Sequence, residues 1–208
     1  MPTRRRRQWV SLAIASYLAQ TYKKTELLIL QDEGDGLQDL VTSDHRIRLF
    51  TVRERYRVGW KRNWLCERAS GQLIIHWDDD EWNHRDRITE QLADVGAHPE
   101  AAVWGFRSLH FWDTTTKQAW LYDGRLDYAL GTTLCYRRDW WAVNRFQNEQ
   151  VGEDTEFVKR AVRQGKLFSR PSGGLMVARN HGANTSGRYA GIRWHKIASA
   201  ELPAGFEW

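Results

Sequence analysis

The most constraining feature of the sequence is a short apolar segment that leads directly into a run of acidic residues. Residues 72–77 (QLIIHW) have the length and composition of a buried β-strand, and the acids of residues 78–81 (DDDE) follow without a break. A second apolar segment, residues 26–31 (ELLILQ), ends in the acid- and glycine-rich loop 32–36 (DEGDG). In open α/β sheets ligands bind beyond the carboxyl ends of the strands. The pattern therefore predicts an acidic ligand site at two strand ends.

Predicted helices alternate with these strands. The spacing of apolar residues indicates helices over residues 8–21, 60–69 and 154–164, and a further short strand over residues 47–52. Gly71 and Gly165 are placed to end the second and third helices in the left-handed conformation. This order predicts an α/β fold with a mostly parallel central sheet flanked by helices.

The rest of the chain is less regular. Residues 101–136 combine β-forming and aromatic segments, which indicates strands that extend the sheet or cross its edge. Several glycines among polar residues follow Pro171, and they predict a loop-rich, mobile C-terminal part.

The composition is that of one folded domain. The chain has 208 residues, of which 41% are hydrophobic and 27% charged, and this fits a single domain over residues 1–208 rather than a disordered or fibrous protein. The apolar stretch at residues 10–19 is too short to cross a bilayer, and no signal-peptide cleavage site follows it. We expect Cys66 and Cys135 to be reduced and the location to be cytoplasmic.

The formal net charge of +5 suits anionic partners such as nucleotide diphosphates, anionic lipid surfaces or nucleic acid. Charge alone does not select among them. Residues 4–7 (RRRR) form either a phosphate-binding patch or a solvated loop and helix start. No RNA-binding aromatic motif or helix-turn-helix pattern accompanies them, so we expect no nucleic-acid partner.

The three consecutive aspartates after residue 77 suggest a metal site. Like charges packed at a strand end repel, and Mg²⁺ or Mn²⁺, which take oxygen ligands, are a usual compensation. A solvated acidic turn is the alternative, and the position directly after a buried strand favours the metal. His181, in the segment 179–182 (RNHG), is either a metal ligand or a loop histidine.

A second acidic pair, Glu153 and Asp154, follows Gly152 at the start of a predicted helix. Acids are stabilised at helix N-termini, and Asp is a preferred N-cap residue, so capping is one interpretation of Asp154. Catalysis is compatible with it, because a carboxylate held by helix amides is fixed in place and stays ionised.

Aromatic residues surround the candidate site. By strand alternation His76 points opposite to Trp77, and we expect it to pack or to form hydrogen bonds within the fold. Aromatic faces can stack on sugar rings or bases, but we interpret most of the nearby tryptophans as core residues. They are Trp77, Trp82, Trp104, Trp112, Trp140 and Trp141.

Taken together, these segments resemble family 2 glycosyltransferases of the GT-A fold over nearly the whole chain. Residues 2–4 (PTR) look like the family's first loop, residues 61–82 like its central nucleotide and metal segment, and residues 151–157 (VGEDTEF) like its acidic motif before a helix. The resemblance implies a nucleotide-binding part at about residues 1–100 and an acceptor-side part at about residues 101–208.

The resemblance also implies roles for individual residues. Asp32 is similar to the acid that contacts the base of the donor, Thr3 to a loop residue nearby, and Arg62 to the basic residue at the nucleotide. Asp78 and Asp79 are likewise implied in donor binding.

The resemblance also implies a metal site and a catalytic base. Asp78 and Asp80 match the outer positions of the metal-binding D-x-D pattern, with Asp79 between them, and His181 resembles a further ligand of Mn²⁺ or Mg²⁺. Asp154 matches the catalytic base of inverting members. His181 lies in a segment that resembles a loop closing over the diphosphate and that includes Asn184, Ser186 and Arg188.

The sequence departs from the family pattern at three points. Gln31 stands where many members have the first acid of an Asp-Asp pair, and Glu81 replaces a frequent fourth Asp. The family also has a β-strand before the loop that begins at Pro2. We therefore expect a domain that lacks this first strand or whose start is truncated.

The implied reaction is transfer of a sugar from a nucleoside diphosphate sugar, with a UDP-sugar favoured, to a saccharide or other hydroxyl acceptor with inversion. Association with a membrane is expected only through the acceptor. Two alternatives stay open. Clustered aspartates also serve metal-dependent phosphoryl transfer or nuclease chemistry, although no P-loop pattern is present. The other is a non-catalytic module that binds carbohydrate or nucleic acid through its aromatic and basic residues.

Overall fold

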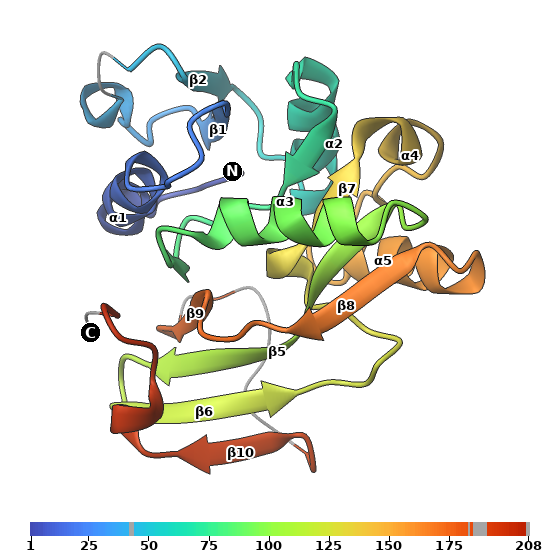
Figure 1. The fold of residues 1–208 in the computed structure, drawn as a ribbon. Helices are drawn as coiled ribbons and strands as arrows, with labels where there is room; N and C mark the ends of the chain where they lie inside the picture. Colours follow the sequence, from blue (N-terminus) through green and yellow to red (C-terminus); the bar gives the residue numbers. More distant parts are fainter. Residues whose placement is uncertain (42–43, 183, 185–190, 207–208) are drawn as a thin grey trace.

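The computed structural model describes residues 1–41, 44–182, 184 and 191–206. Helices alternate with strands in the first half, whereas strands predominate after residue 100 (Figure 1). The helices are α1 (Arg7–Leu18), α2 (Val58–Arg68), α3 (Arg87–Ala97), α4 (Arg138–Val143) and α5 (Glu153–Arg163), with the short 3-10 turns η1 (Gln38–Leu40), η2 (Gly131–Thr133) and η3 (Ser199–Glu201).

The strands form two sheets. They are β1 (Leu27–Asp32), β2 (Ile47–Val52), β3 (Leu73–Ile75), β4 (Trp82–Asn83), β5 (Val103–Asp113), β6 (Gln118–Asp123), β7 (Cys135–Arg137), β8 (Leu167–Pro171), β9 (Met176–Asn180) and β10 (Trp194–Ile197). β1 and β2 pair in parallel, with Leu27 opposite Ile47. The larger sheet has the order β10-β6-β5-β7-β3, β8 and β9 also pair with β5, and β4 pairs with β9.

The predicted α/β class is confirmed, but the larger sheet is mixed rather than mostly parallel, whereas β1 and β2 form a small parallel sheet. β5 pairs in parallel with β8 and β9 and in antiparallel with β6 and β7. The physical reason is the short connection between β5 and β6, since a few residues can join antiparallel neighbours but a parallel pair needs a long crossover.

Several predicted elements are confirmed within a few residues, namely α1, β1, β2, α2 and α5, and Gly165 follows α5 with a φ of 63°. Others differ. Gly71 does not adopt a positive φ, since α2 ends at Arg68 and the chain leaves it in an extended conformation. The C-terminal part contains β8, β9 and β10 in addition to loops, and α3 was not predicted.

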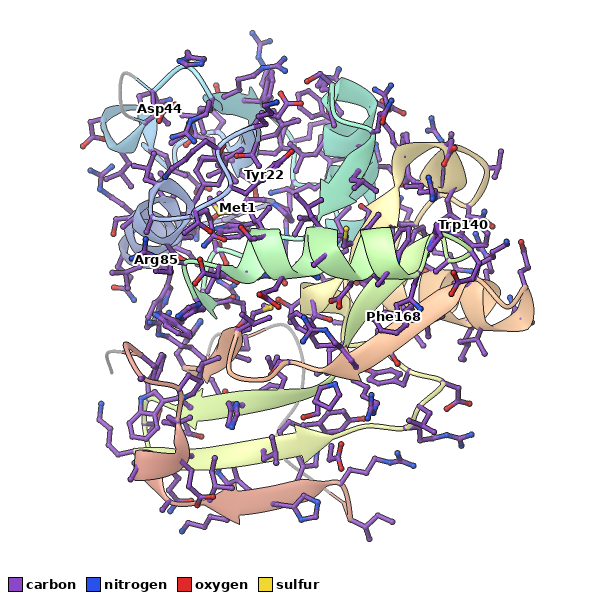
Figure 2. All side chains as sticks on the ribbon, in the orientation of Figure 1. Met1, Tyr22, Asp44, Arg85, Trp140 and Phe168 are labelled. Carbon is purple, nitrogen blue, oxygen red and sulfur yellow. The ribbon has the colours of Figure 1, made fainter. Side chains whose placement is uncertain are left out.

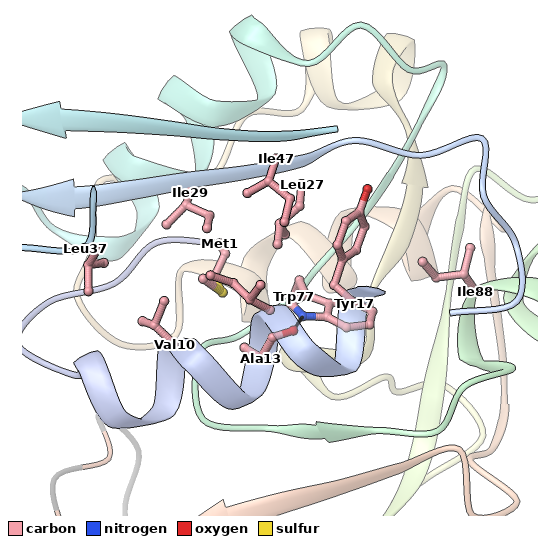
Figure 3. Packing of buried hydrophobic residues seen from close by; sticks show 11 residues of the cluster. Met1, Val10, Ala13, Tyr17, Leu27, Ile29, Leu37, Ile47, Trp77 and Ile88 are labelled. Carbon is pink, nitrogen blue, oxygen red and sulfur yellow. Dashed lines mark hydrogen bonds between the residues drawn. The ribbon is translucent and has the colours of Figure 1, made fainter. Parts of the chain in front are cut away.

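A buried cluster between α1 and β1 fixes the end of the strand segment that precedes the acidic run. Trp77 lies edge-to-face with Tyr17, at 6.0 Å between ring centroids, and its indole Nε1 donates a hydrogen bond to the carbonyl of Ala13 at 3.1 Å (Figure 3). Trp77 is 4% exposed. Because Asp78 is the next residue, this packing determines where the acidic run begins.

The first residues lie along the edge of β1. The amide of Thr3 donates to the carbonyl of Leu30 at 3.0 Å, and Pro2 pairs with Leu30 as an isolated parallel bridge. Within the described residues α1 is the first regular element, and residues 1–3 pair with β1 ahead of it. Side chains fill the space between the layers throughout the molecule (Figure 2). In the described ranges, no helix has both the length and the apolar character needed to span a membrane.

Replacement of Gly59 by alanine is expected to destabilise the fold. An added Cβ would lie 1.8 Å from the carbonyl oxygen of Gln147, which is backbone and cannot rotate away. We expect the free energy of unfolding in urea to fall by at least about 1–3 kcal/mol, as for other overpacked sites. Gly96→Ala is the matched control, because Gly96 lies in α3 with no heavy atom within 4 Å of the added Cβ. Equal stability of the two variants would contradict the packing of α2 against residue 147.

Candidate active site

A cavity of about 700 Å³ brings together acids that are far apart in the sequence. It lies where residues 2–6, the segment after β2 and the acidic run after β3 meet the start of α5. Of the predicted site residues, six line it directly: Thr3, Arg62, Asp78, Asp79, Asp80 and Asp154. Asp32 and His181 lie just behind the lining, where each contacts a residue of the cavity wall.

Asp32 is held at the end of β1 by a buried lysine of α2. Lys61 Nζ is paired with Asp32 Oδ1 and donates a further hydrogen bond to the carbonyl of Thr3 at 3.0 Å. Arg4 Nε lies 3.3 Å from the second oxygen of Asp32. Thr3 in turn donates its hydroxyl to Asp79 Oδ2 at 2.6 Å. The predicted base-contacting residues, Asp32 and Thr3, are thus linked to one lysine and to the acidic run.

Arg62 joins the two acidic motifs. Its Nε donates to Glu153 Oε1 at 2.9 Å, and its Nη2 lies 3.2 Å from Asp78 Oδ1. The side chain of Arg62 is 8% exposed and that of Glu153 is 7% exposed. Burial acts to raise the pKa of Asp78, but the Arg62 guanidinium reverses this and lowers it to about 2. Asp78 is therefore ionised over the whole physiological range.

The remaining acids of the run are crowded. Arg6 Nη1 bridges Asp79 Oδ1 at 2.9 Å and Asp80 Oδ2 at 2.8 Å. Burial and the adjacent Asp80 nevertheless raise the pKa of Asp79 to about 6. Burial and Asp80 also raise the pKa of Glu81 well above its ordinary value, and within the described chain Glu81 Oε2 is buried without a hydrogen-bond partner. The cluster therefore carries more negative charge than its protein cations compensate.

His181 reaches the same cluster from the segment after β9. Its Nε2 lies 3.1 Å from Asp80 Oδ2, and its ring stacks on Trp9 at 4.8 Å between centroids. Asn184 donates its amide to Asp80 Oδ2 at 3.3 Å and accepts from the His181 backbone at 2.7 Å. The other two residues of the resembled loop, Ser186 and Arg188, lie outside the described residues.

These residues fit a divalent cation in part. Asp80 and His181 are in contact and supply an oxygen and a nitrogen ligand, whereas Asp78 faces Arg62. Among the residues that the structure describes, no three histidine, cysteine or acidic side chains are close enough to hold a metal by themselves. This suits Mg²⁺ or Mn²⁺, which commonly take one or two protein carboxylates and complete their ligand set with substrate phosphates.

Asp154 lies in the first turn of α5 and is not its N-cap residue, which is Gly152 with a φ of 80°. The interpretation of Asp154 as the N-cap residue is therefore wrong, although Asp154 does lie in the first turn of the helix. Its carboxylate packs directly on Gly131 of η2, where an added Cβ would lie 1.4 Å from Asp154 Oδ2. Burial raises the pKa of Asp154, an effect that Arg62 opposes.

His76 contacts Gly131, the residue on which the Asp154 carboxylate packs. Its Nδ1 lies 2.6 Å from the carbonyl oxygen of Gly131, and its Nε2 lies 3.2 Å from the hydroxyl of Tyr136. The expectation that His76 is satisfied within the fold is confirmed. Burial lowers the pKa of His76 well below its ordinary value, so the ring is neutral.

None of the six tryptophans singled out in the sequence lines the cavity. Trp77, Trp104, Trp112 and Trp141 are buried, which confirms the core interpretation for them. The cavity-lining aromatic residues of the second half are instead Phe111, Tyr122, Tyr128 and Trp194. Phe111, Tyr122 and Trp194 lie in β5, β6 and β10, and no local sequence pattern shows that β10 pairs with β6.

Several residues of the site were missed because no local pattern marks them. Lys61 adjoins Arg62 in the sequence, and no local pattern predicts its role. Arg6 is one of four consecutive arginines, and the sequence does not distinguish it from the other three. Glu153 adjoins Asp154, but the sequence does not predict its ionic partner. No sequence motif marks Gly131. Each acquires its place through a contact across more than 20 residues.

Comparison with known proteins agrees with this geometry. A model of glycosyl transferase family 2 matches residues 1–149, and the chain belongs to this family, which confirms the resemblance. A protein described as an uncharacterized glycosyltransferase from Rickettsia felis is 33% identical over 96 residues, which cover 44% of this chain and 16% of that protein.

Two solved structures share the GT-A fold. S. aureus TarS 1–349 in complex with UDP-GlcNAc aligns with a TM-score of 0.73 at 15% identity, over 91% of this chain and 60% of that one. The mannosyltransferase PcManGT from Pyrobaculum calidifontis, in complex with GDP-Man and Mn²⁺, aligns with a TM-score of 0.65 at 14% identity, over 86% of this chain and 55% of that one. The chain thus spans less than two thirds of the length of each of these three proteins.

Arg62→Met is expected to destabilise the protein strongly. It removes the cation that pairs with the buried Glu153 in the described part of the chain, and it leaves Asp78 beside it. Removal of one partner from a buried ion pair costs about 3–5 kcal/mol of unfolding free energy. Arg125→Met is the matched control, because its pair with Asp127 is exposed and such pairs contribute about 0–1 kcal/mol. Urea unfolding of both variants tests this, and a loss below about 1 kcal/mol for Arg62→Met would contradict the buried pairing.

Proposed function

We propose that the chain transfers a sugar from a nucleoside diphosphate sugar to an acceptor hydroxyl, with inversion at the anomeric carbon. Asp154 is the general base. The observation that carries the proposal is the common cavity, in which Asp154 lies within one space of about 700 Å³ with the acids Asp78, Asp79 and Asp80. Donor binding and proton transfer can therefore occur on one bound substrate pair.

The donor lies over the first half of the cavity, at about residues 1–100. Thr3, and Asp32 behind it where Lys61 holds it, lie on the side of its base, while Arg62, Asp78 and Asp79 lie along the ribose and diphosphate. The cations of this half suit a diphosphate, which carries negative charge. A UDP-sugar is the favoured donor. Support comes from the solved relatives, which are described with UDP-GlcNAc and with GDP-Man.

The chemical step needs one base and one leaving group. The acceptor oxygen forms a bond to the anomeric carbon as its proton passes to Asp154, and the bond from that carbon to the diphosphate oxygen breaks. The electron pair stays with the nucleoside diphosphate, so no covalent enzyme intermediate is needed. The raised pKa of Asp154 favours this role, because a base accepts a proton more readily as its pKa approaches the working pH.

Asp78, Asp80 and His181 are the residues that would hold Mn²⁺ or Mg²⁺. Such a cation, when bound, neutralises charge on the departing diphosphate as a Lewis acid. The solved mannosyltransferase relative is described with Mn²⁺, and this supports a divalent cation without choosing between the two metals.

The acceptor lies over the second half, at about residues 101–208, and is a saccharide or another hydroxyl compound. A cytoplasmic location is part of the proposal, with any membrane association supplied by the acceptor. The alternative of phosphoryl transfer is less favoured, because the acids suit one diphosphate-bound cation rather than a pair of metals. A purely binding module has no use for a base, and it makes a different prediction for Asp154.

Asp154→Asn is expected to reduce turnover about 100- to 10,000-fold, the usual contribution of a general base, and to leave UDP binding unchanged. The measurement is UDP release from a panel of UDP-hexoses, with UDP affinity followed by calorimetry. Glu156→Gln is the matched control, because it changes the same kind of group two residues further along α5, where Glu156 pairs with Arg163. Unchanged turnover in Asp154→Asn would remove the base assignment. Lost turnover with intact UDP binding would exclude the binding module.

Asp80→Ala is expected to abolish metal-dependent nucleotide binding. Calorimetric titration with UDP, with and without Mn²⁺, should show tighter binding with the metal in the natural chain. With Mn²⁺ present, the affinity of the variant for UDP should be at least about tenfold lower than that of the natural chain. The exposed Asp123 supplies the control variant Asp123→Ala. If a folded sample binds UDP equally well with and without Mn²⁺, the metal part of the proposal is wrong.

A further inference from the structure

The two halves of the cavity have different chemistry. The described lining residues that carry positive charge all come from the first 62 residues: Arg4, Arg5, Arg6, Arg55, Lys61 and Arg62. Among the described lining residues after residue 100 there is no lysine or arginine. That side carries a set of rings that we call the aromatic wall, formed by Phe111, Tyr122, Tyr128 and Trp194.

The aromatic wall is built on one face of the larger sheet. Tyr122 of β6 is the register partner of Trp194 of β10, and the two ring centroids are 4.9 Å apart. Phe111 of β5 meets Trp194 edge-to-face at 4.7 Å. The rings are only partly buried, so their contacts with one another do not cover them. They form a preorganised surface that faces the cavity.

Tyr128 connects the aromatic wall to the base. It meets Tyr122 edge-to-face at 6.1 Å between centroids. Burial, with a further contribution from the charge of Asp154, raises the pKa of Tyr128 to about 12. The phenol therefore stays neutral and senses the Asp154 carboxylate. Tyr128 and Asp154 also line the same cavity.

The chemistry of the wall selects among acceptors. The C–H face of a pyranose is apolar and packs on aromatic rings, while its hydroxyls point outward. Gln150 lines the same cavity and is exposed, so its amide offers hydrogen-bonding groups to such hydroxyls. A polyol phosphate or another phosphate-rich acceptor would need cationic partners, which the described lining on this side does not contain.

We propose that the aromatic wall is the acceptor subsite and binds a ring of a neutral saccharide, with one hydroxyl directed at Asp154. This inference rests on the proposed function and narrows its acceptor from any hydroxyl compound to an uncharged sugar. Tyr128 and Trp194 are the residues that determine this specificity.

The test is a titration of the whole chain, with UDP and Mn²⁺ present, followed by saturation-transfer NMR. The probes are three neutral trisaccharides of different linkage, cellotriose, maltotriose and chitotriose, compared with glycerol 1-phosphate and ribitol 5-phosphate. We expect at least one trisaccharide to bind and to outcompete both polyol phosphates. Preferential binding of a polyol phosphate, or no binding of any trisaccharide to protein that binds UDP, would overturn the inference.

Variants of the aromatic wall locate the binding. Trp194→Ala and Tyr128→Ala are expected to weaken trisaccharide binding about tenfold each, whereas Trp194→Phe and Tyr128→Phe, which keep a ring, should restore most of it. Two alanine variants are used so that the loss of one to misfolding leaves a test. Unchanged affinity in a folded alanine variant would overturn the wall assignment.

UDP affinity in the same samples separates the two proposals. Loss of UDP binding in the natural chain would contradict the proposed function itself. Retained UDP binding with no effect of the wall variants would contradict only the acceptor inference.

Discussion

The site depends on two consecutive cations of α2 that are buried among carboxylates. Lys61 pairs with Asp32 at the end of β1, and Arg62 pairs with Asp78 after β3 and with Glu153 at the start of α5. Unpaired carboxylates at these depths would be costly, so the helix and the three acidic segments stabilise one another only in this arrangement. The same pairs bring the donor-side acids and the helix of Asp154 to one cavity, and the geometry of the site is therefore also a condition of the fold.

Many of the helices and strands around the site could be predicted from the sequence, but few of the side-chain pairs between them could. The strand that runs into Asp78 and the helix after Gly152 follow from local patterns, and the family resemblance named the acids. The partner of Glu153 lies 91 residues away, and the bridge from Arg6 to Asp80 spans 74 residues. Such pairings depend on the tertiary arrangement, which apolar spacing does not encode. The mixed sheet escaped prediction for a related reason, since strand direction depends on connection length as well as on composition.

Asp154 is fixed in place without being the N-cap residue of its helix. Its carboxylate rests on Gly131, whose carbonyl contacts His76, and Thr133 of the same turn is tied to the backbone of β5 at Phe106. A side chain at position 131 would occupy the place of the carboxylate. The turn after Leu130 thus packs against the carboxylate of Asp154. The buried His76 contacts this turn and is neutral, so it adds no charge near Asp154.

Charge and apolar surface are divided across the cavity because the two halves of the chain supply different walls. The first half gathers carboxylates with arginine and lysine side chains, and its acids are still incompletely compensated, as the raised pKa values of Asp79 and Glu81 show. Such a cluster can take up a further cation together with the phosphates that the cation binds. The second half offers rings from adjacent strands instead. Asp154 lines the cavity that the charged wall and the aromatic wall share, so both kinds of surface border one space with its carboxylate.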